Sequence, residues 1–279
     1  MKKKIKFAKR DFTECDLPHT RYEVFTDILK VRFDLIIKTG LILLASLIPL
    51  IIFSLTKNIY TFTLNDNLAN KVIDADLYEQ SFFSLNIIFG ILQLLSLPIF
   101  AFGISGTLNI FKRLCFYDSI QFKEDFFKGV KANFRHTCIT FMLVGILYFL
   151  SIFYTLMNRS NGNDFISVIF CYLPVVLGIV LVIPPLVMVL FQIPIYQNTY
   201  TQYLKNAMFF YGKTAFKTIG FLISLSIPFL PLLIENIYSM IISIILVGLI
   251  VAPISMLVLT LYCNSIFDEY LNKESFKEI

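Results

Sequence analysis

The stretch LIIKTGLILLASLIPLIIFSLT, residues 35–56, decides the fold of this chain. It contains one ionisable residue, Lys38, which lies four positions after Asp34, so the two charges can pair on a helix while the lysine stem reaches toward water. At 1.5 Å per residue a helix of this length covers about 33 Å, enough to cross a hydrocarbon core of about 30 Å. The stretch therefore predicts a membrane-spanning helix.

Composition extends this conclusion to the whole chain of 279 residues. Hydrophobic residues make up 57% and charged residues 15%, against roughly 45–50% and about 25% in ordinary soluble domains. Too few charges remain to cover a surface that faces water. The sequence predicts an all-α integral membrane protein.

Five further apolar runs are long enough to cross the membrane, which makes six spans in total. We place the spans at residues 35–56, 82–111, 138–157, 166–196, 216–234 and 237–263. Proline inside a helix removes a backbone donor and clashes with the preceding turn, so we expect kinks where prolines interrupt the runs. The candidate kink positions are Pro98, Pro184, Pro185, Pro228 and Pro253.

The positions of lysine and arginine predict the orientation. Residues 1–34 hold nine of them and residues 112–136 hold six, whereas the three alternate loops hold only Lys57, Lys71 and Arg159. Loops on the cytoplasmic side carry the lysine and arginine excess. We therefore expect both termini in the cytoplasm, with a basic segment at 1–34, a membrane domain at 35–267 and a tail at 268–279.

Three segments that precede spans carry apolar residues on one side and charges on the other. These segments, residues 20–34, 121–135 and 201–215, are predicted to be amphipathic helices at the cytoplasmic face. In the second, Asp125 is expected to point away from the apolar side, and in the third Met208 is expected to lie on it. Whether the three helix-plus-hairpin units form a true repeat stays open. Their lysines offer a candidate docking face, made of Lys128, Lys131, Lys205 and Lys213.

Catalytic and cofactor-binding patterns are missing from the sequence. The middle of each predicted span has neither a carboxylate nor a histidine, although charges at membrane depth are retained chiefly for function. His19 and His136 stand apart from the five cysteines, which form no CxxC pair, and no phosphate-binding GxxxxGK[ST] motif occurs. We expect no enzyme, no cofactor, no metal site and no nucleic-acid partner.

Segments spread over most of the chain resemble the YesL-type family of bacterial multi-pass membrane proteins. The similar segments are LPHTRYEVFTDILKVRFDLI, FKRLCFYDSIQFKEDFFKGVKANF, QYLKNAMFFYGKTAFKTIGFL and NSIFDEYLNKE. The resemblance implies a bacterial cell membrane protein associated with carbohydrate uptake or breakdown. No reaction is established for that family, so the resemblance assigns no catalytic residue.

Two functions are compatible with these observations. The first is an accessory component that binds an ABC transporter or another membrane protein through its cytoplasmic helices; self-association is left open. The alternative is a small-solute transporter whose site lies between the second, fourth, fifth and sixth spans, where the prolines concentrate. Broken helices that line a midplane site are typical of such carriers.

Overall fold

A computed structural model describes residues 20–158, 165–233 and 237–270 of the chain. Throughout these ranges the backbone is helical except for short connections. In chain order the elements are α1 (Arg21–Val31), α2 (Phe33–Ala69), α3 (Ala75–Cys115), α4 (Phe122–Asn158), α5 (Phe165–Leu177), the π-helix η2 (Gly178–Val182), α6 (Ile183–Gln192), α7 (Tyr200–Ser226), the 3-10 helix η3 (Ile227–Leu233), α8 (Ile237–Leu246), the π-helix η4 (Val247–Val251) and α9 (Ala252–Tyr270).

The predicted count of six spans is confirmed within the described residues. Six helical stretches there are long and apolar enough to cross a membrane, and each overlaps one predicted span. Several are longer than predicted: α3 has 41 residues, or about 61 Å, roughly twice the hydrocarbon thickness. The apolar stretch of sequence shows where a span lies, but the helix extends beyond that stretch until other groups satisfy its terminal backbone N–H and C=O groups.

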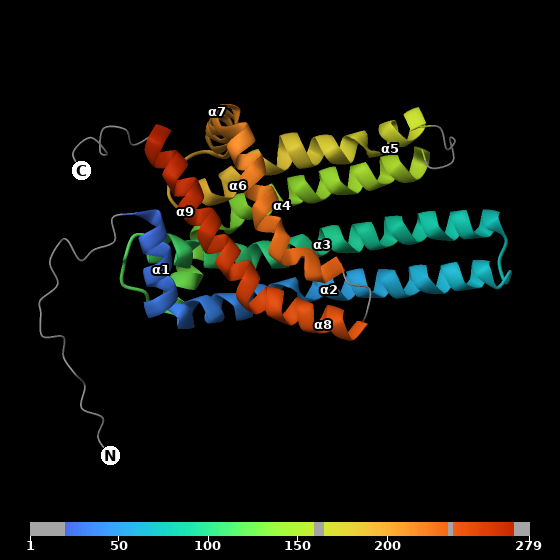
Figure 1. Ribbon diagram of the computed structural model, residues 1–279, viewed down its shortest axis with the longest axis horizontal. Helices are drawn as coiled ribbons and strands as arrows, with labels where there is room; N and C mark the ends of the chain where they lie inside the picture. The colour runs from blue at the N-terminus through green and yellow to red at the C-terminus, as the bar shows by residue number, and fades with distance from the viewer. Residues whose placement is uncertain (1–19, 159–164, 234–236, 271–279) are drawn as a thin grey trace, which may run out of the picture.

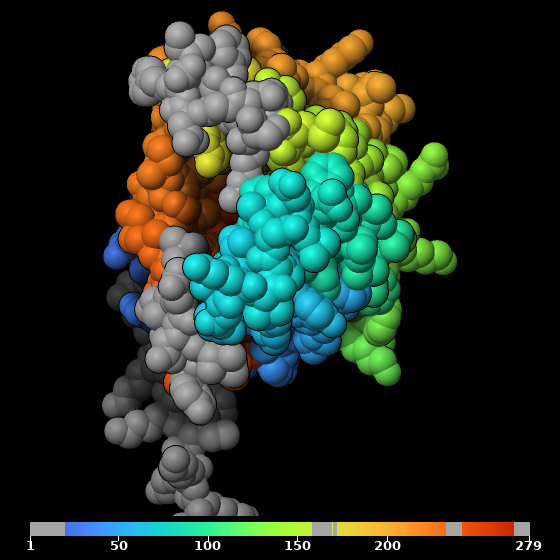
Figure 2. Space-filling view, turned by 90° about the vertical axis from the view of Figure 1, so that its right-hand side faces the viewer, coloured from blue at the N-terminus to red at the C-terminus, as the bar shows by residue number. Residues whose placement is uncertain are grey.

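Long antiparallel helices form the body of the molecule (Figure 1). The hairpin of α2 and α3 runs along the long axis, α4 packs beside α3, and the α8–η4–α9 segment crosses the hairpin. Figure 2 looks at the end where residues 70–74 connect α2 to α3, and this hairpin tip stands nearest the viewer. The opposite end, called the basic end below, carries α1, the α3–α4 connection, the α6–α7 connection and the end of α9.

Close approach between α2 and η4 depends on glycine. A methyl group added at Gly40 would lie 2.2 Å from the carbonyl oxygen of Leu249, which is backbone and cannot turn aside. Small residues at helix interfaces allow this kind of contact inside membranes. Gly40 therefore fixes where the α8–η4–α9 segment crosses the hairpin.

Helix α1 lies across the basic end (Figure 1). It begins with a capping box, in which the Thr20 hydroxyl accepts from the Glu23 N–H at 3.2 Å and the Glu23 carboxylate accepts from the Thr20 N–H at 3.4 Å. Val24 and Ile28 lie on one side of α1 and are buried against α3 and α9. Arg21 forms an ion pair with Asp268, so the start of α1 and the end of α9 lie at the same end of the bundle.

The other two amphipathic segments differ from the prediction. Residues 122–135 are the first part of α4 without a break, because Arg135, His136 and Thr137 do not interrupt a helix. Residues 201–215 belong to α7, which bends at Thr214, where φ is −124° and ψ is 17°. The part before the bend is seen end-on in Figure 1 and so lies across the bundle axis.

Met208 of α7 is 57% exposed, so the expectation that it lies on the apolar side was wrong. Tyr203, Ala207, Phe210 and Tyr211 are buried and pack against α6 and α9, and Leu204 and Ala215 pack against the same cluster.

Four of the five candidate kink prolines stand where the helical type changes. Pro184 and Pro185 open α6 directly after η2, Pro253 follows η4, and Pro228 lies in η3. Pro98, in contrast, lies inside α3, which stays one α-helix through it.

The proline pair leaves one carbonyl without a backbone donor. The carbonyl of Val180 would accept from residue 184 in an α-helix or from residue 185 in a π-helix, and neither proline has an N–H. The hydroxyl of Tyr211 on α7 donates to this carbonyl at 2.5 Å. A neighbouring helix thus satisfies the group that the prolines leave free, as expected for proline inside a membrane.

Candidate functional site

The strongest candidate site is a cavity at the basic end, between α3, α4 and the connection from α6 to α7. Its α3–α4 wall is fixed by Asp125. The Asp125 carboxylate accepts from Arg113 Nη1 at 3.0 Å and from the Gln121 backbone N–H at 2.8 Å, and the Asn109 amide donates to the Asp125 carbonyl at 2.8 Å. Asp125 is 6% exposed, so the prediction that it points away from the apolar side was wrong, because Arg113 offers it a partner inside.

The connection of residues 193–199 forms the opposite wall. Lys112 Nζ, at the end of α3, donates to the Pro194 carbonyl at 2.7 Å. On the other side the Tyr203 hydroxyl donates to the Tyr196 carbonyl and accepts from the Asn198 N–H at 3.2 Å. Hydrogen bonds from α3 and α7 therefore hold this irregular segment in place.

Between these walls lies a cavity of about 710 Å³. Three of its lining groups can carry positive charge: Lys112, Lys128 and His136. Amides and hydroxyls supply most other polar atoms, and the described lining contains no carboxylate. The further lining residues are Asn109, Ala132, Asn133, Ile193, Pro194, Ile195, Tyr196, Gln197, Asn198, Thr199, Gln202 and Tyr203.

Aromatic contacts position His136 at the back of this cavity. Its ring stacks on Tyr200, with centroids 6.1 Å apart, and meets Tyr203 edge-to-face at 5.7 Å. The Tyr200 hydroxyl in turn lies 3.1 Å from the Thr140 hydroxyl, one turn further along α4. These contacts attach the start of α7 to α4, and with it the N-terminal end of the α7 dipole, which is positive.

Only one of the predicted docking lysines lines the cavity. Lys128 does so, whereas Lys131, Lys205 and Lys213 are exposed outside it. Lys131 follows Lys128 by one turn, and Lys205 follows the lining residue Gln202 by one turn. Lys213 lies eight residues further along α7, about 12 Å away, so the four do not form one compact patch.

The polar residues that complete the cavity were not predicted. In the sequence Lys112 contributes only to the charge balance, and no pattern marks Asn133 or residues 193–199. Lys112 and Pro194 are 82 positions apart, so no local spacing could pair them. The weak signal available was an amide-rich stretch, Gln197–Asn198–Thr199, directly before an amphipathic helix.

Cavities within the spans have a different character. One of about 310 Å³ lies between α2, α3, α7, η3 and α9, close to where the carrier hypothesis expects a site. Its walls are carbon except for Ser226 and Ser255, and the Ser226 hydroxyl already donates to the Ile223 carbonyl at 2.7 Å. This cavity lacks the polar groups that would replace the hydration shell of a polar solute.

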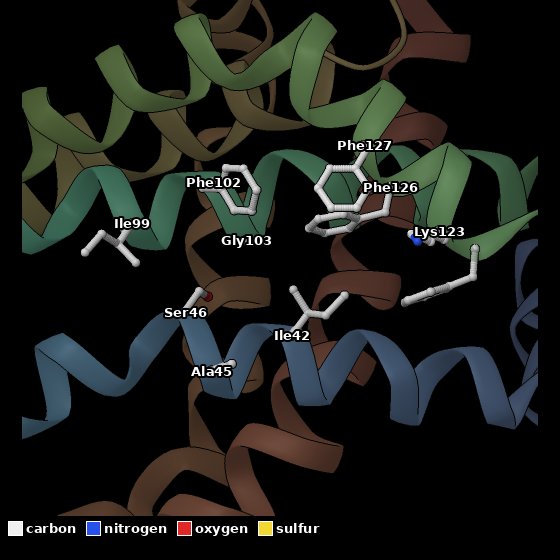
Figure 3. A pocket seen from close by; sticks show the side chains of 10 residues that line it. Ile42, Ala45, Ser46, Ile99, Phe102, Gly103, Lys123, Phe126 and Phe127 are labelled. Atoms are coloured by element: carbon white, nitrogen blue, oxygen red, sulfur yellow. The ribbon is translucent and has the colours of Figure 1, made fainter.

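A second apolar cavity, of about 370 Å³, lies between α2, α3 and α4 (Figure 3). Ile42, Ala45 and Ser46 of α2 face Ile99 and the other α3 residues, while phenyl rings of α4 close one end beside Lys123. Its lining is also apolar apart from Ser46 and Lys123. A hydrocarbon chain matches such walls, whereas a polar substrate does not.

The described residues form neither a metal-binding cluster nor a disulfide. No group of three or more His, Cys, Asp or Glu side chains there could hold a metal ion. Cys115, Cys138 and Cys263 are free thiols. His19 and Cys15 lie outside the described residues.

Comparison of the sequence and fold with family models, with curated proteins and with solved structures gave no match. The similarity to the YesL-type family accordingly rests on the four sequence segments quoted above.

Proposed function

We propose that this protein is an accessory component of a bacterial cytoplasmic membrane, which binds a membrane partner through its basic end. The observation that carries the proposal is the division of charge between the two ends of the bundle. Lysines and arginines of α1, of the α3–α4 region and of α7 gather at the basic end, where α1 and the first part of α7 lie across the bundle axis.

The same division supports a cytoplasmic location for the basic end. Toward the far end of the described α2–α3 hairpin the cations are Lys57 and Lys71, and this region also carries Asp66, Asp74, Asp76 and Glu79. The end rich in lysine and arginine is the one that stays in the cytoplasm. Both the start of α1 and the end of α9 then lie on that side.

Carriage of a small polar solute is less well supported. The π-helical turns before Pro184 and Pro253 are interruptions of the kind that carriers use. The cavity near Pro253 is nevertheless walled by carbon except for two serines, and no residue around Pro184 lines it. The cavity at the basic end, in contrast, is lined by lysines, amides and hydroxyls. Carbohydrate uptake as the process served comes from the family resemblance alone, and an ABC transporter for carbohydrate is the partner it suggests.

Charge reversal combined with affinity capture tests the docking proposal. Lys128, Lys131, Lys205 and Lys213 are changed together to glutamate, and tagged protein is captured from native membranes with proteins identified by mass spectrometry. We expect a carbohydrate transporter to be captured by the wild-type chain and lost with the variant, although membrane insertion is unchanged.

The matched control reverses the charge at the opposite end, with Lys57 and Lys71 changed to glutamate. This control should retain the partner. Equal capture by the wild-type chain and the fourfold variant would contradict docking through the basic end.

A further inference from the structure

The cavity at the basic end has the features of an anion site. Lys112 and Lys128 come from two different helices and line the same space, as does His136. Lys112 donates to the neutral Pro194 carbonyl, and the exposed Lys128 forms no ion pair with a described residue. Two ammonium groups therefore lie in a shared cavity without a carboxylate between them.

Nearby acids do not cancel this charge within the cavity. Asp125 does not line the cavity, and its carboxylate is engaged by Arg113 and by the Gln121 N–H. Asp118, whose charge acts on Lys112, belongs to the α3–α4 connection and does not line the cavity. Glu124, one turn before Lys128, is exposed and lies outside the lining.

The start of α7 adds a third positive contribution from a different element. Thr199, Gln202 and Tyr203 of its first turn line the cavity, so the N-terminal end of a 27-residue helix opens onto it. A capping box engages part of this end, since the Thr199 N–H donates to Gln202 Oε1 at 2.9 Å and the Gln202 N–H to the Thr199 carbonyl at 3.0 Å. The helix dipole and the remaining first-turn N–H groups favour phosphate and other anions.

A nearly buried amide lines the cavity and is accessible from it. Asn133 is only 6% exposed, no described residue hydrogen-bonds its side-chain amide, and its polar atoms are not among the fully enclosed ones. A polar group that enters the cavity can therefore hydrogen-bond this amide. Gln197 and Asn198 offer further amides around the same space, whereas the amides of Asn109 and Gln202 already hydrogen-bond Asp125 and Thr199.

We propose that this cavity binds the phosphate group of a small hydroxyl-bearing phosphoester. Lys112, Lys128 and the first turn of α7 would hold the phosphate, and the amides of Asn133 and its neighbours would accept and donate to hydroxyl groups. Such chemistry exists both in soluble phosphoesters and in glycerophospholipid headgroups. The proposal does not depend on partner docking, because Lys112, Asn133 and the first turn of α7 line the cavity while Lys131, Lys205 and Lys213 lie outside it; Lys128 alone belongs to both features.

The test uses the full chain in nanodiscs made of neutral phosphatidylcholine, titrated with glycerol 3-phosphate by calorimetry. Lys128→Gln removes one charged contact and should weaken binding about tenfold. The matched control is Lys123→Gln, which removes an exposed lysine from the same helix outside this cavity. Binding to the control should equal that of the wild-type chain.

A second arm distinguishes the lipid source from the soluble one. Native mass spectrometry after nanodisc reconstitution with equal phosphatidylglycerol and phosphatidylcholine should show selective retention of phosphatidylglycerol if the headgroup is the natural occupant. That retention should fall with Lys128→Gln and persist with Lys123→Gln. Glycerol 3-phosphate binding without lipid selectivity would assign the soluble source.

Two results would overturn the proposal. One is the absence of both glycerol 3-phosphate binding and phosphatidylglycerol selectivity in folded wild-type protein. The other is an equal loss with Lys128→Gln and Lys123→Gln, which would show a diffuse basic surface rather than a site.

Discussion

Replacing Tyr211 by phenylalanine isolates the cross-helix hydrogen bond that satisfies the Val180 carbonyl. Tyr211 is 8% exposed and its ring packs within the α6–α7–α9 cluster, so phenylalanine keeps the packing and removes only the hydroxyl. The 2.5 Å bond to Val180 is then lost, and Pro184 and Pro185 provide no backbone donor in its place.

The expected cost is about 1–2 kcal/mol of unfolding free energy. A buried acceptor left without a donor costs about 1–3 kcal/mol, while side-chain hydrogen bonds between membrane helices average about 0.6 and reach about 1.7 kcal/mol. The upper part of the membrane range applies here because the backbone has no alternative partner for this carbonyl. Unfolding by SDS titration in mixed micelles, followed by far-ultraviolet circular dichroism, measures the difference.

A double-mutant cycle supplies the decisive comparison. Changing Pro184 and Pro185 together to alanine restores an N–H to the Val180 carbonyl in either helical register, so Tyr211→Phe should cost less than about 0.5 kcal/mol in that background. The alanine changes alter stability themselves, and only the difference between the two Tyr211→Phe costs is interpreted. If that cost is the same in both backgrounds, the hydroxyl does not act through the carbonyl that the prolines leave free.

The remaining predictions concern helix contact and orientation. Gly40→Ala should destabilise the protein by about 1–3 kcal/mol, because the added methyl would lie 2.2 Å from the Leu249 carbonyl oxygen. Gly220→Ala is the control: it lies inside α7 with open space around it and should stabilise the protein by up to about 1 kcal/mol. Equal effects of the two variants in the same SDS titration would refute the close-contact argument. In a cysteine-free background, a membrane-impermeant thiol reagent added outside intact cells should label a cysteine placed at Asp74 and miss one placed at Lys205; the reverse pattern would invert the proposed orientation.

Membrane spans could be predicted from the sequence because each depends on a local sum of side-chain transfer energies. The run at residues 35–56 needs no knowledge of its neighbours, and α2 indeed contains it. Helix ends depend on other forces. Residues 122–135 continue into α4 because nothing in that segment breaks the backbone hydrogen bonds, whereas α1 and α2 separate at Arg32, with φ −123° and ψ 24°.

The candidate site could be predicted only in part, for a physical reason. Lys128 was recognisable because amphipathic periodicity places it on the polar side of its own helix. Lys112 and Asn133 become part of a cavity only because residues from other elements lie opposite them. The α6–α7 connection, which packs across α3, supplies that opposite wall. A polar residue in a membrane protein thus gains its role from tertiary neighbours that periodicity does not reveal.

Helix α7 links the proposed phosphate site to the interior of the membrane. Tyr203 forms part of the cavity wall and fixes the α6–α7 connection, while Tyr211, two turns later on the same buried side, satisfies the Val180 carbonyl before α6. Both contacts join the part of α7 before the Thr214 bend to the α5–α6 segment or its exit. A displacement of residues 200–213 along α6 would therefore break both contacts at once, opening the cavity wall and leaving the Val180 carbonyl without a donor. Because the free-energy cost of both losses opposes such a movement, the first part of α7 is held rigidly at the basic end.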